Sequence, residues 1–232
     1  MYKGKRFLAI IPARGGSKRL PRKNLLNLSG KPLITWSIKA GLNSKYIDNI
    51  VVTSDDEKIL RLSIELGVGA RKRPDYLASD TASTFDAVKD VINNMDNYDY
   101  IVLLQPTSPL RTEKHIDEAI ELLETNSADA VISVCELEHS PLWANVLPVD
   151  GNMTGFLRSE IVNKRSQDLE PFYSPNGAIY ICKLDKLLTE EGFFIKDKIF
   201  AYKMDKNTSV DIDEEIDFLL AEVLFNYTSI LV

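Results

Sequence analysis

The sequence predicts an α/β fold built on a doubly wound, mostly parallel sheet. As far as about residue 135, short runs of consecutive apolar residues alternate with amphipathic segments of helical spacing. A polar or glycine-containing segment follows each apolar run. A continuous apolar run is typical of a parallel strand that is buried on both faces. A chain of 232 residues also suits one large domain with a substantial core.

Composition excludes several classes of protein. The net charge of -6 and the pI near 5.1 argue against a general nucleic-acid-binding protein. No apolar run reaches the ~18 residues of a membrane span, and the run after the basic start ends at Pro12, too early for a signal peptide. Cys135 and Cys182 lie in apolar runs, which favours buried thiols over a redox pair. We expect a cytoplasmic protein.

The first apolar run, residues 7–11, leads into a basic loop that we define as residues 13–24. Gly15 and Gly16 allow positive φ and close backbone approach. Five cations follow one another within ten residues: Arg14, Lys18, Arg19, Arg22 and Lys23. The loop lacks the Walker pattern and the dinucleotide fingerprint. Because open α/β sheets bind ligands beyond the carboxyl ends of their strands, we expect it to bind phosphates.

The next elements alternate along the chain. A helix is expected from Lys31-Pro32 to about residue 42, then a strand over 50–53 and a helix over 57–66. Asp55 and Asp56, between that strand and helix, are interpreted as helix caps in preference to ligands. Residues 73–84 connect to a helix over 84–95, and their hydroxyl groups cap that helix or line a nucleotide pocket.

A strand over residues 100–104 ends in a segment that contains Pro106 and Pro109. The two prolines stiffen this exit, so Gln105 is expected to stay at the carboxyl edge of the sheet. An amphipathic helix around 116–123 and a strand over 130–134 complete the alternation.

The alternation stops near residue 141. Residues 141–175 contain turn residues, strand fragments and several aromatic side chains, but no amphipathic helix. A structureless stretch of this length inside a compact domain usually packs against something, and its aromatic residues suggest a second subunit. Strands are then expected over 176–182 and 198–204, followed by a helix over 213–225. Its buried side is expected to carry Ile216, Leu219, Leu220, Val223 and Leu224.

Asp211 and Asp213 lie just before this last helix. On extended backbone, residues i and i+2 project to the same side, so both carboxylates can hold one Mg²⁺ that takes its other ligands from phosphates and water. Alternatively, Asp213 caps the helix and Asp211 is exposed to solvent. Both interpretations stand.

Several motifs in order resemble those of the CMP-sialic acid synthetases, also called acylneuraminate cytidylyltransferases. They lie at residues 14–24, 77–83, 104–111, 175–181, 193–194 and 211–213. The resemblance implies a single Rossmann-like cytidylyltransferase domain over residues 1–232, with an inserted dimerisation segment at about 141–175. It also implies that CTP and a nine-carbon 2-keto sugar acid give a CMP-sugar and pyrophosphate, with Mg²⁺.

The resemblance also implies roles for individual residues. Arg14 and Lys23 would be catalytic, together with Gln105 and Asp211, and Asp211 and Asp213 would bind the metal. Arg14, Ser17, Lys23 and Asn24 would hold the triphosphate, and Arg73 and Thr84 would lie at the cytidine. Gln105 and Tyr180 would lie at the sugar. Further substrate contacts would come from Arg165, Asn176, Phe193 and Phe194. The general base is not identified.

Two departures affect the sugar. Trp143 stands where some family members have a lysine, and the register of the arginine that would pair with the sugar carboxylate, Arg165, is uncertain. N-acetylneuraminate, legionaminic acid and pseudaminic acid therefore remain alternatives. A synthetase for the eight-carbon acid Kdo, a non-catalytic nucleotide-sugar binding protein and a protein interaction module are further alternatives. A homodimer is expected, with Arg165 in its own site or in that of the neighbouring subunit.

Overall fold

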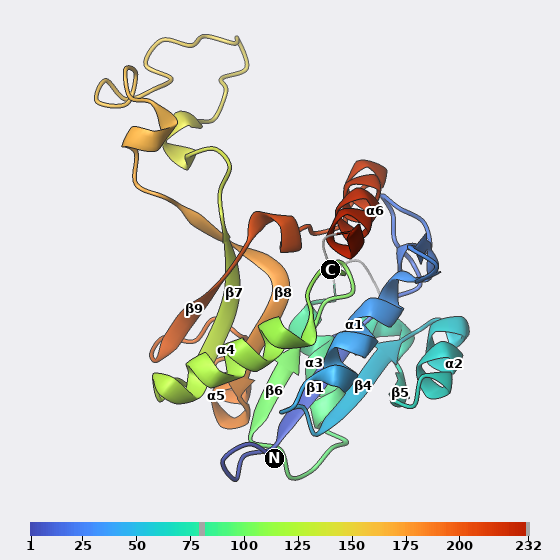
Figure 1. The fold of residues 1–232 in the computed structure, drawn as a ribbon. Coiled ribbons are helices and arrows are strands. Elements are labelled where there is room, and N and C mark those ends of the chain that lie inside the picture. Colours follow the sequence, from blue (N-terminus) through green and yellow to red (C-terminus); the bar gives the residue numbers. More distant parts are fainter. Residues whose placement is uncertain (79–81, 231–232) are drawn as a thin grey trace.

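The computed structural model describes residues 1–78 and 82–230, which form a seven-stranded sheet with helices on both faces (Figure 1). The strand order is β5-β4-β1-β6-β8-β7-β9, and β8 alone among these is antiparallel to its neighbours. The strands are β1 (Phe7–Pro12), β4 (Asn49–Ser54), β5 (Gly69–Lys72), β6 (Tyr100–Leu103), β7 (Ala130–Glu136), β8 (Tyr173–Lys183) and β9 (Ile199–Met204). This confirms the predicted doubly wound, mostly parallel sheet.

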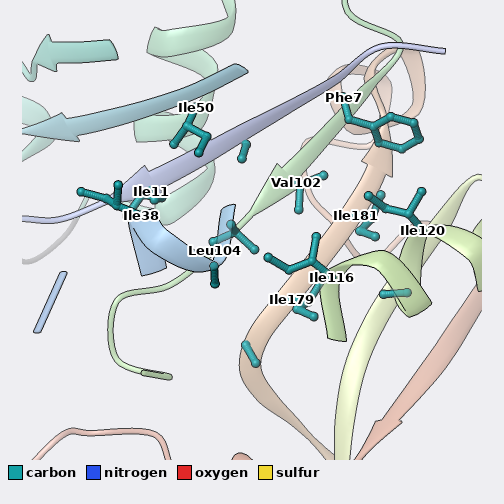
Figure 2. Packing of buried hydrophobic residues seen from close by; sticks show 14 of the residues in the cluster. Phe7, Ile11, Ile38, Ile50, Val102, Leu104, Ile116, Ile120, Ile179 and Ile181 are labelled. Carbon is teal, nitrogen blue, oxygen red and sulfur yellow. The ribbon is translucent and has the colours of Figure 1, made fainter. Parts of the chain in front are cut away.

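The sheet separates two apolar layers. Phe7, Ala9 and Ile11 of β1 contribute to one layer and Leu8 and Ile10 to the other, and all five are fully buried. Figure 2 shows side chains of the first layer between the sheet and two helices. The continuous apolar run was therefore a correct indication of a strand buried on both faces.

The helices divide between the two faces of the sheet. Those that contribute to the first layer are α1 (Leu33–Asn43), α2 (Glu57–Glu65) and α4 (Glu113–Thr125), whereas α3 (Thr84–Ile92) and α5 (Leu184–Thr189) contribute to the second. The remaining elements are α6 (Glu215–Ile230), a small hairpin of β2 (Asn27–Leu28) and β3 (Lys31–Pro32), and the short 3-10 helices η1 (Lys23–Leu25), η2 (Asp75–Leu77), η3 (Pro141–Trp143), η4 (Ser166–Asp168) and η5 (Lys206–Thr208).

Sequence reasoning missed β5 and α5 and was wrong about α6. The β5 sequence Gly-Ala-Arg-Lys has no apolar run because β5 is an edge strand. On α6, Ile216, Leu219, Leu220 and Val223 are exposed. The helix packs through Ala221, Phe218 and Phe225. The correction has a physical reason: α6 carries apolar residues around most of its circumference, so spacing alone does not identify the buried side.

Residues 137–172, which we call the arm, connect β7 to β8 and project away from the sheet (Figure 1). The arm contains η3 and η4 but no strand, and residues 173–175 of the predicted excursion belong to β8. Among the described residues, no helix is long and apolar enough to cross a membrane. Both cysteines are free thiols, with Cys182 buried and Cys135 half-buried.

Candidate active site

A cavity of about 310 Å³ is lined by residues that follow the carboxyl ends of β1 and β6 and by the start of α3. This first cavity brings together seven residues that the sequence singled out: Arg14, Ser17, Lys23, Asn24, Arg73, Thr84 and Gln105. They come from four separate segments of the chain. The fold thus gathers at one place the residues that were expected at phosphates and cytidine together with Gln105, whereas Asn176, Tyr180, Phe193 and Phe194 do not line this cavity.

The basic loop is fixed onto the neighbouring strand. The Gly15 backbone N–H donates to Asp55 Oδ1 at 2.8 Å, and Asn24 Nδ2 donates to the Arg14 carbonyl at 2.9 Å. A Cβ atom at Gly15 would lie 2.9 Å from the Asp56 Cβ. Asp56 caps α2 as predicted, but Asp55 is instead an anchor for the basic loop. The sequence signal for that role was only its place after the next strand.

The conformation of the loop differs from one expectation. Neither Gly15 nor Gly16 adopts a positive φ, whereas Arg22 does, at 55°. Gly15 is required because the loop passes close to Asp56, and not because of its backbone dihedral angle. Left-handed backbone at Arg22 turns the chain into η1 and carries Lys23 inward.

Lys23 connects the basic loop to Asp213, one of the two predicted metal ligands. Its side chain is buried, and its Nζ donates to the Ile212 carbonyl and to Asp213 Oδ1, the latter at 3.2 Å. Arg19 Nη1 donates to Asp213 Oδ2 at 2.9 Å. A second cavity of about 260 Å³ is lined by Arg14, Ser17, Lys18, Arg19, Leu20, Lys23 and Asp213. Since three of these residues also line the first cavity, the basic loop offers cationic walls to both.

Thr84 and Arg73 also line the first cavity. Ser83 caps α3 in a capping box with Asp86, and Ser83 and Thr84 both line the cavity. Ser83 therefore both caps the helix and lines the cavity, and the expected contact with a nucleotide stays a prediction. Residues 79–81 of this segment lie outside the described part of the chain. Arg73 Nη2 donates to the Thr53 carbonyl at 3.0 Å, and burial lowers the Arg73 pKa, opposed by the charge of Asp55.

Gly177 is the point at which the side chains of Gln105, Ser108 and Asp211 converge. Its φ is 75°, and a Cβ atom there would lie 2.8 Å from Gln105 Oε1, 3.3 Å from Ser108 Oγ and 3.5 Å from Asp211 Oδ2. A larger residue would push these three groups away from the backbone. Sequence reasoning quoted Gly177 as part of a motif but gave it no role. The Asn-Gly pair within an apolar strand was the available signal.

Asn176 supports this point from beneath. Its buried Oδ1 accepts from Ser133 Oγ at 2.6 Å, and its Nδ2 donates to Ser209 Oγ at 2.9 Å. The β7–β8 register shifts between Ile132 and Val134, beside this network. Asn176 therefore ties the irregular part of β8 to β7 and to the segment that precedes Asp211.

Tyr180, Phe193 and Phe194 form an aromatic cluster. The ring centroid of Tyr180 lies 5.8 Å from that of Phe193 and 6.2 Å from that of Phe194. Phe193 is buried and Phe194 is 64% exposed. Burial raises the pKa of Tyr180, and the negative charge of Asp211 raises it further. The cluster is therefore within electrostatic reach of Asp211.

Asp211 and Asp213 are the candidate ligands for a magnesium ion. Protein atoms around the Asp211 carboxyl group disfavour its charged form and raise its pKa, a hydrogen bond with Thr107 lowers it, and the charge of Asp213 raises it again. A bound cation would stabilise both carboxylates. Among the described residues there is no group of three or more histidine, cysteine or acidic residues suited to a metal. Two carboxylates suffice for Mg²⁺, which keeps waters and takes phosphate oxygens.

Arg165 is the predicted site residue that the structure places on the arm. Its guanidinium is exposed and forms a bidentate ion pair with Asp168, at 2.9 and 3.1 Å. Arg165 lines neither the first nor the second cavity, and Trp143 also lies on the arm. One described chain therefore does not bring Arg165 to the other predicted site residues.

Comparison with known proteins gives matches over nearly the whole chain. Residues 8–226 match the cytidylyltransferase family. An N-acylneuraminate cytidylyltransferase of Streptococcus agalactiae is 38% identical over 95% of this chain and 54% of its own length. A CMP-N,N'-diacetyllegionaminic acid synthase of Legionella pneumophila is 35% identical over 94% of this chain and 96% of its own length. The chain spans about half the length of the N-acylneuraminate cytidylyltransferases first matched.

A solved structure has the same fold. It is a CMP:2-keto-3-deoxy-manno-octonic acid synthetase complexed with CTP. The TM-score is 0.73 over 97% of this chain and 100% of that one, and the sequence identity is 18%.

Proposed function

The chain belongs to the cytidylyltransferase family, and we propose that it transfers CMP from CTP to a nine-carbon 2-keto sugar acid, N-acetylneuraminate or a related acid. The products would be a CMP-sugar and pyrophosphate. The observation that carries this proposal is the first cavity, because its lining combines the basic loop with Gln105 at the exit of β6.

The nucleotide side of the site would use the basic loop and the start of α3. Arg14, Ser17, Lys23 and Asn24 would hold the triphosphate, since they offer cations and polar hydrogen atoms along one wall. Arg73 and Thr84 would lie at the cytidine. The hydrogen bond from Gly15 to Asp55 supports this assignment, because it holds the loop in place before any ligand binds.

The sugar side would use Gln105 and the aromatic cluster of Tyr180, Phe193 and Phe194. Gln105 Oε1 and Asp211 Oδ2 both lie over Gly177, so a sugar hydroxyl group brought to this point would meet them together. Asn176 would contribute by keeping β8 in the shape that leaves Gly177 open.

The reaction requires one bond to form and one to break. The anomeric hydroxyl oxygen of the sugar acid would attack the α-phosphorus of CTP and its proton would pass to solvent water, while the bond from the α-phosphorus to the bridging oxygen breaks and pyrophosphate leaves. Arg14 and Lys23 would stabilise the negative charge that grows on the phosphates. Asp211 and Asp213 would hold Mg²⁺, which supplies further positive charge to the phosphate oxygens.

The Legionella relative favours a second acceptor. That protein is a CMP-N,N'-diacetyllegionaminic acid synthase, and this chain covers 96% of its length. Legionaminate shares the 2-keto acid head with N-acetylneuraminate, so the same phosphate chemistry would serve both. Trp143 on the arm, where a lysine occurs in some family members, is a candidate for the difference.

We also propose that the chain acts as a homodimer through the arm. Val146, Leu147, Val149 and Met153 of the arm are exposed, and exposed apolar patches of this kind usually mark interfaces. A two-fold axis would bury the same patch twice. The arm would then carry Arg165 to the sugar carboxylate in the neighbouring subunit. Sedimentation at micromolar concentration should give a dimer, and a stable, fully active monomer would contradict this part.

The experiment that tests the proposed function is a panel of acceptors. The purified chain is incubated with CTP, Mg²⁺ and N-acetylneuraminate, legionaminate, pseudaminate or Kdo in turn, and pyrophosphate release is measured. We expect release with at least one nine-carbon acid, no release with CTP alone and a much lower rate with Kdo. Absence of release with all nine-carbon acids would contradict the proposal and favour a non-catalytic binding protein.

A further inference from the structure

Arg111 is a buried arginine whose charge has no counter-ion among the described residues. It ends the segment that follows β6, two residues before α4, and its side chain is 2% exposed. Nη1 donates to the Gln105 carbonyl at 3.2 Å and to the Ala178 carbonyl at 2.8 Å. Nε and Nη2 are buried with no hydrogen-bond partner in the described part of the chain. Burial lowers the pKa of Arg111 to about 9.

Stability alone is a poor explanation for this residue. Removing a cation from water costs several kcal/mol unless charges or hydrogen bonds compensate. Two of the three guanidinium nitrogens of Arg111 have no such compensation among the described residues. A methionine or leucine of similar length would fill the same space without this cost. The role of Arg111 is therefore to be sought in the two backbone segments that its hydrogen bonds hold in place.

Those two hydrogen bonds join the opposite sides of the sugar site. The Gln105 carbonyl belongs to the β6 exit, and the Ala178 carbonyl belongs to β8, directly after Gly177. A weaker link lies beside them, since Ser108 Oγ donates to the Asn176 carbonyl at 3.3 Å. Arg111 thus fixes the backbone on both sides of the point at which Gln105 Oε1 approaches Gly177.

We propose that Arg111 is a positioning residue that holds Gln105 over Gly177 and thereby sets the geometry of the acceptor side of the site. This inference rests on the proposed function. It assigns no contact between Arg111 and either substrate. A guanidinium group suits this task because its N–H groups lie in one plane with fixed directions. The two N–H groups of Nη1 can therefore each donate to one of the two carbonyl oxygens.

The first test separates acceptor binding from nucleotide binding. Arg111→Met should raise the KM for the sugar acid and lower kcat, together on the order of 10- to 100-fold in kcat/KM, because small misplacements of a positioned group carry costs of this size. The Kd for CTP, measured by calorimetry, should change less than about twofold, since Arg111 does not line either cavity.

A matched control accounts for general destabilisation. Asp117→Asn also alters a buried polar residue, which accepts from Ser44 Oγ and from the Lys45 N–H, and it lines neither cavity. It should lower the Tm and leave the KM for both substrates unchanged. If Arg111→Met also lowered only the Tm, the positioning role would be wrong.

A double-mutant cycle asks whether Arg111 acts through Gln105. In a Gln105→Ala background, Arg111→Met should cost little more in kcat/KM for the sugar acid, because the positioned group is already gone. Additive losses would overturn the proposal. If Arg111→Met does not fold, two other variants replace it in the cycle, Arg111→Lys and Ser108→Ala. The Arg111→Lys variant should retain more activity than the double variant that carries both Arg111→Lys and Ser108→Ala.

The outcome for the wild-type chain distinguishes the two proposals. No pyrophosphate release by the wild-type chain with any sugar acid would overturn the proposed function, and this inference with it. Wild-type release together with unchanged acceptor kinetics in the Arg111 variants would overturn this inference alone.

Discussion

The basic loop and the arm differ in what holds them in place. The loop is hydrogen-bonded through Gly15 to Asp55, which directly follows β4, and through Lys23 to residues 212–213. The arm's hydrogen bonds among the described residues join arm residues to one another, as from Asn145 Nδ2 to the Phe156 carbonyl and from Arg165 to Asp168. One chain therefore fixes the basic loop, whereas no hydrogen bond in the described part of the chain joins Arg165 to residues outside the arm.

Metal removal should have the largest effect. The ion would lie beside the basic loop, which contacts within one chain hold in place. Excess chelator should reduce pyrophosphate release to background, and added Mg²⁺ should restore it, since Asp211 and Asp213 are expected to hold the ion beside the phosphates. Asp211→Asn should show a similar loss of turnover with a smaller change in CTP affinity, measured without metal, because the basic loop is unchanged. Full activity in chelator would contradict the magnesium site.

Substitution of Lys23 tests the loop itself. Lys23→Ala should lower kcat on the order of 10²-fold or more, because it removes a preorganised cation from the place where charge develops. Steady-state kinetics and circular dichroism would separate this loss from misfolding. Lys72→Ala is the control, since Lys72 lies on the edge strand β5 and pairs with Glu57. Equal activities of the two variants would show that the loop does not act on the phosphates as proposed.

The smallest effect concerns the scaffold on the nucleotide side. Arg71 donates to both carboxylate oxygens of Asp90, at 2.6 and 2.9 Å, and this holds the pKa of Asp90 below its ordinary value. A depressed pKa contributes stability above the unfolded pKa, about 3.9, and this stability is lost as pH falls through the folded value. Asp90→Asn should therefore lower the free energy of unfolding by about 1 kcal/mol at pH 7.

Denaturant titrations at several pH values would measure this difference. The wild-type chain and the Asp90→Asn variant should differ at pH 7 and converge below about pH 4, because a protonated aspartic acid no longer pairs with Arg71 as an anion. Pyrophosphate release should be unchanged, since neither residue lines the first or the second cavity. A constant difference across pH would show that the ion pair is not its source.

Sequence reasoning identified the parts of the site that depend on residue type and on position after a strand. The apolar run of β1, the cations of the basic loop and Gln105 after β6 could all be predicted, because parallel strands bring their carboxyl ends to one edge. The structure gathers seven of the expected residues around the first cavity. The assigned contacts with substrates remain predictions.

The parts that could not be predicted depend on tertiary contacts. Asp55, Gly177 and Arg111 matter through contacts with groups that are far away in the sequence, so no local pattern indicates them. The buried side of α6 was predicted wrongly because apolar residues surround most of that helix. The position of the arm relative to a second chain lies beyond any pattern in one sequence.

The most direct test of the contrast between loop and arm is complementation between two inactive chains. An Arg165→Ala chain and a Lys23→Ala chain are co-expressed or refolded together, and pyrophosphate release is compared with that of each variant alone. If each site combines one chain's basic loop with its partner's arm, half of the dimers are mixed and each contains one intact site. Activity should then recover to about one quarter of the wild-type value.

Co-purification of an untagged Lys23→Ala chain with an affinity-tagged Arg165→Ala chain is the control that subunits exchange. The predicted result is recovered activity in the mixture of the two variants. No recovery, with exchange demonstrated, would contradict the account and place Arg165 in the site of its own chain.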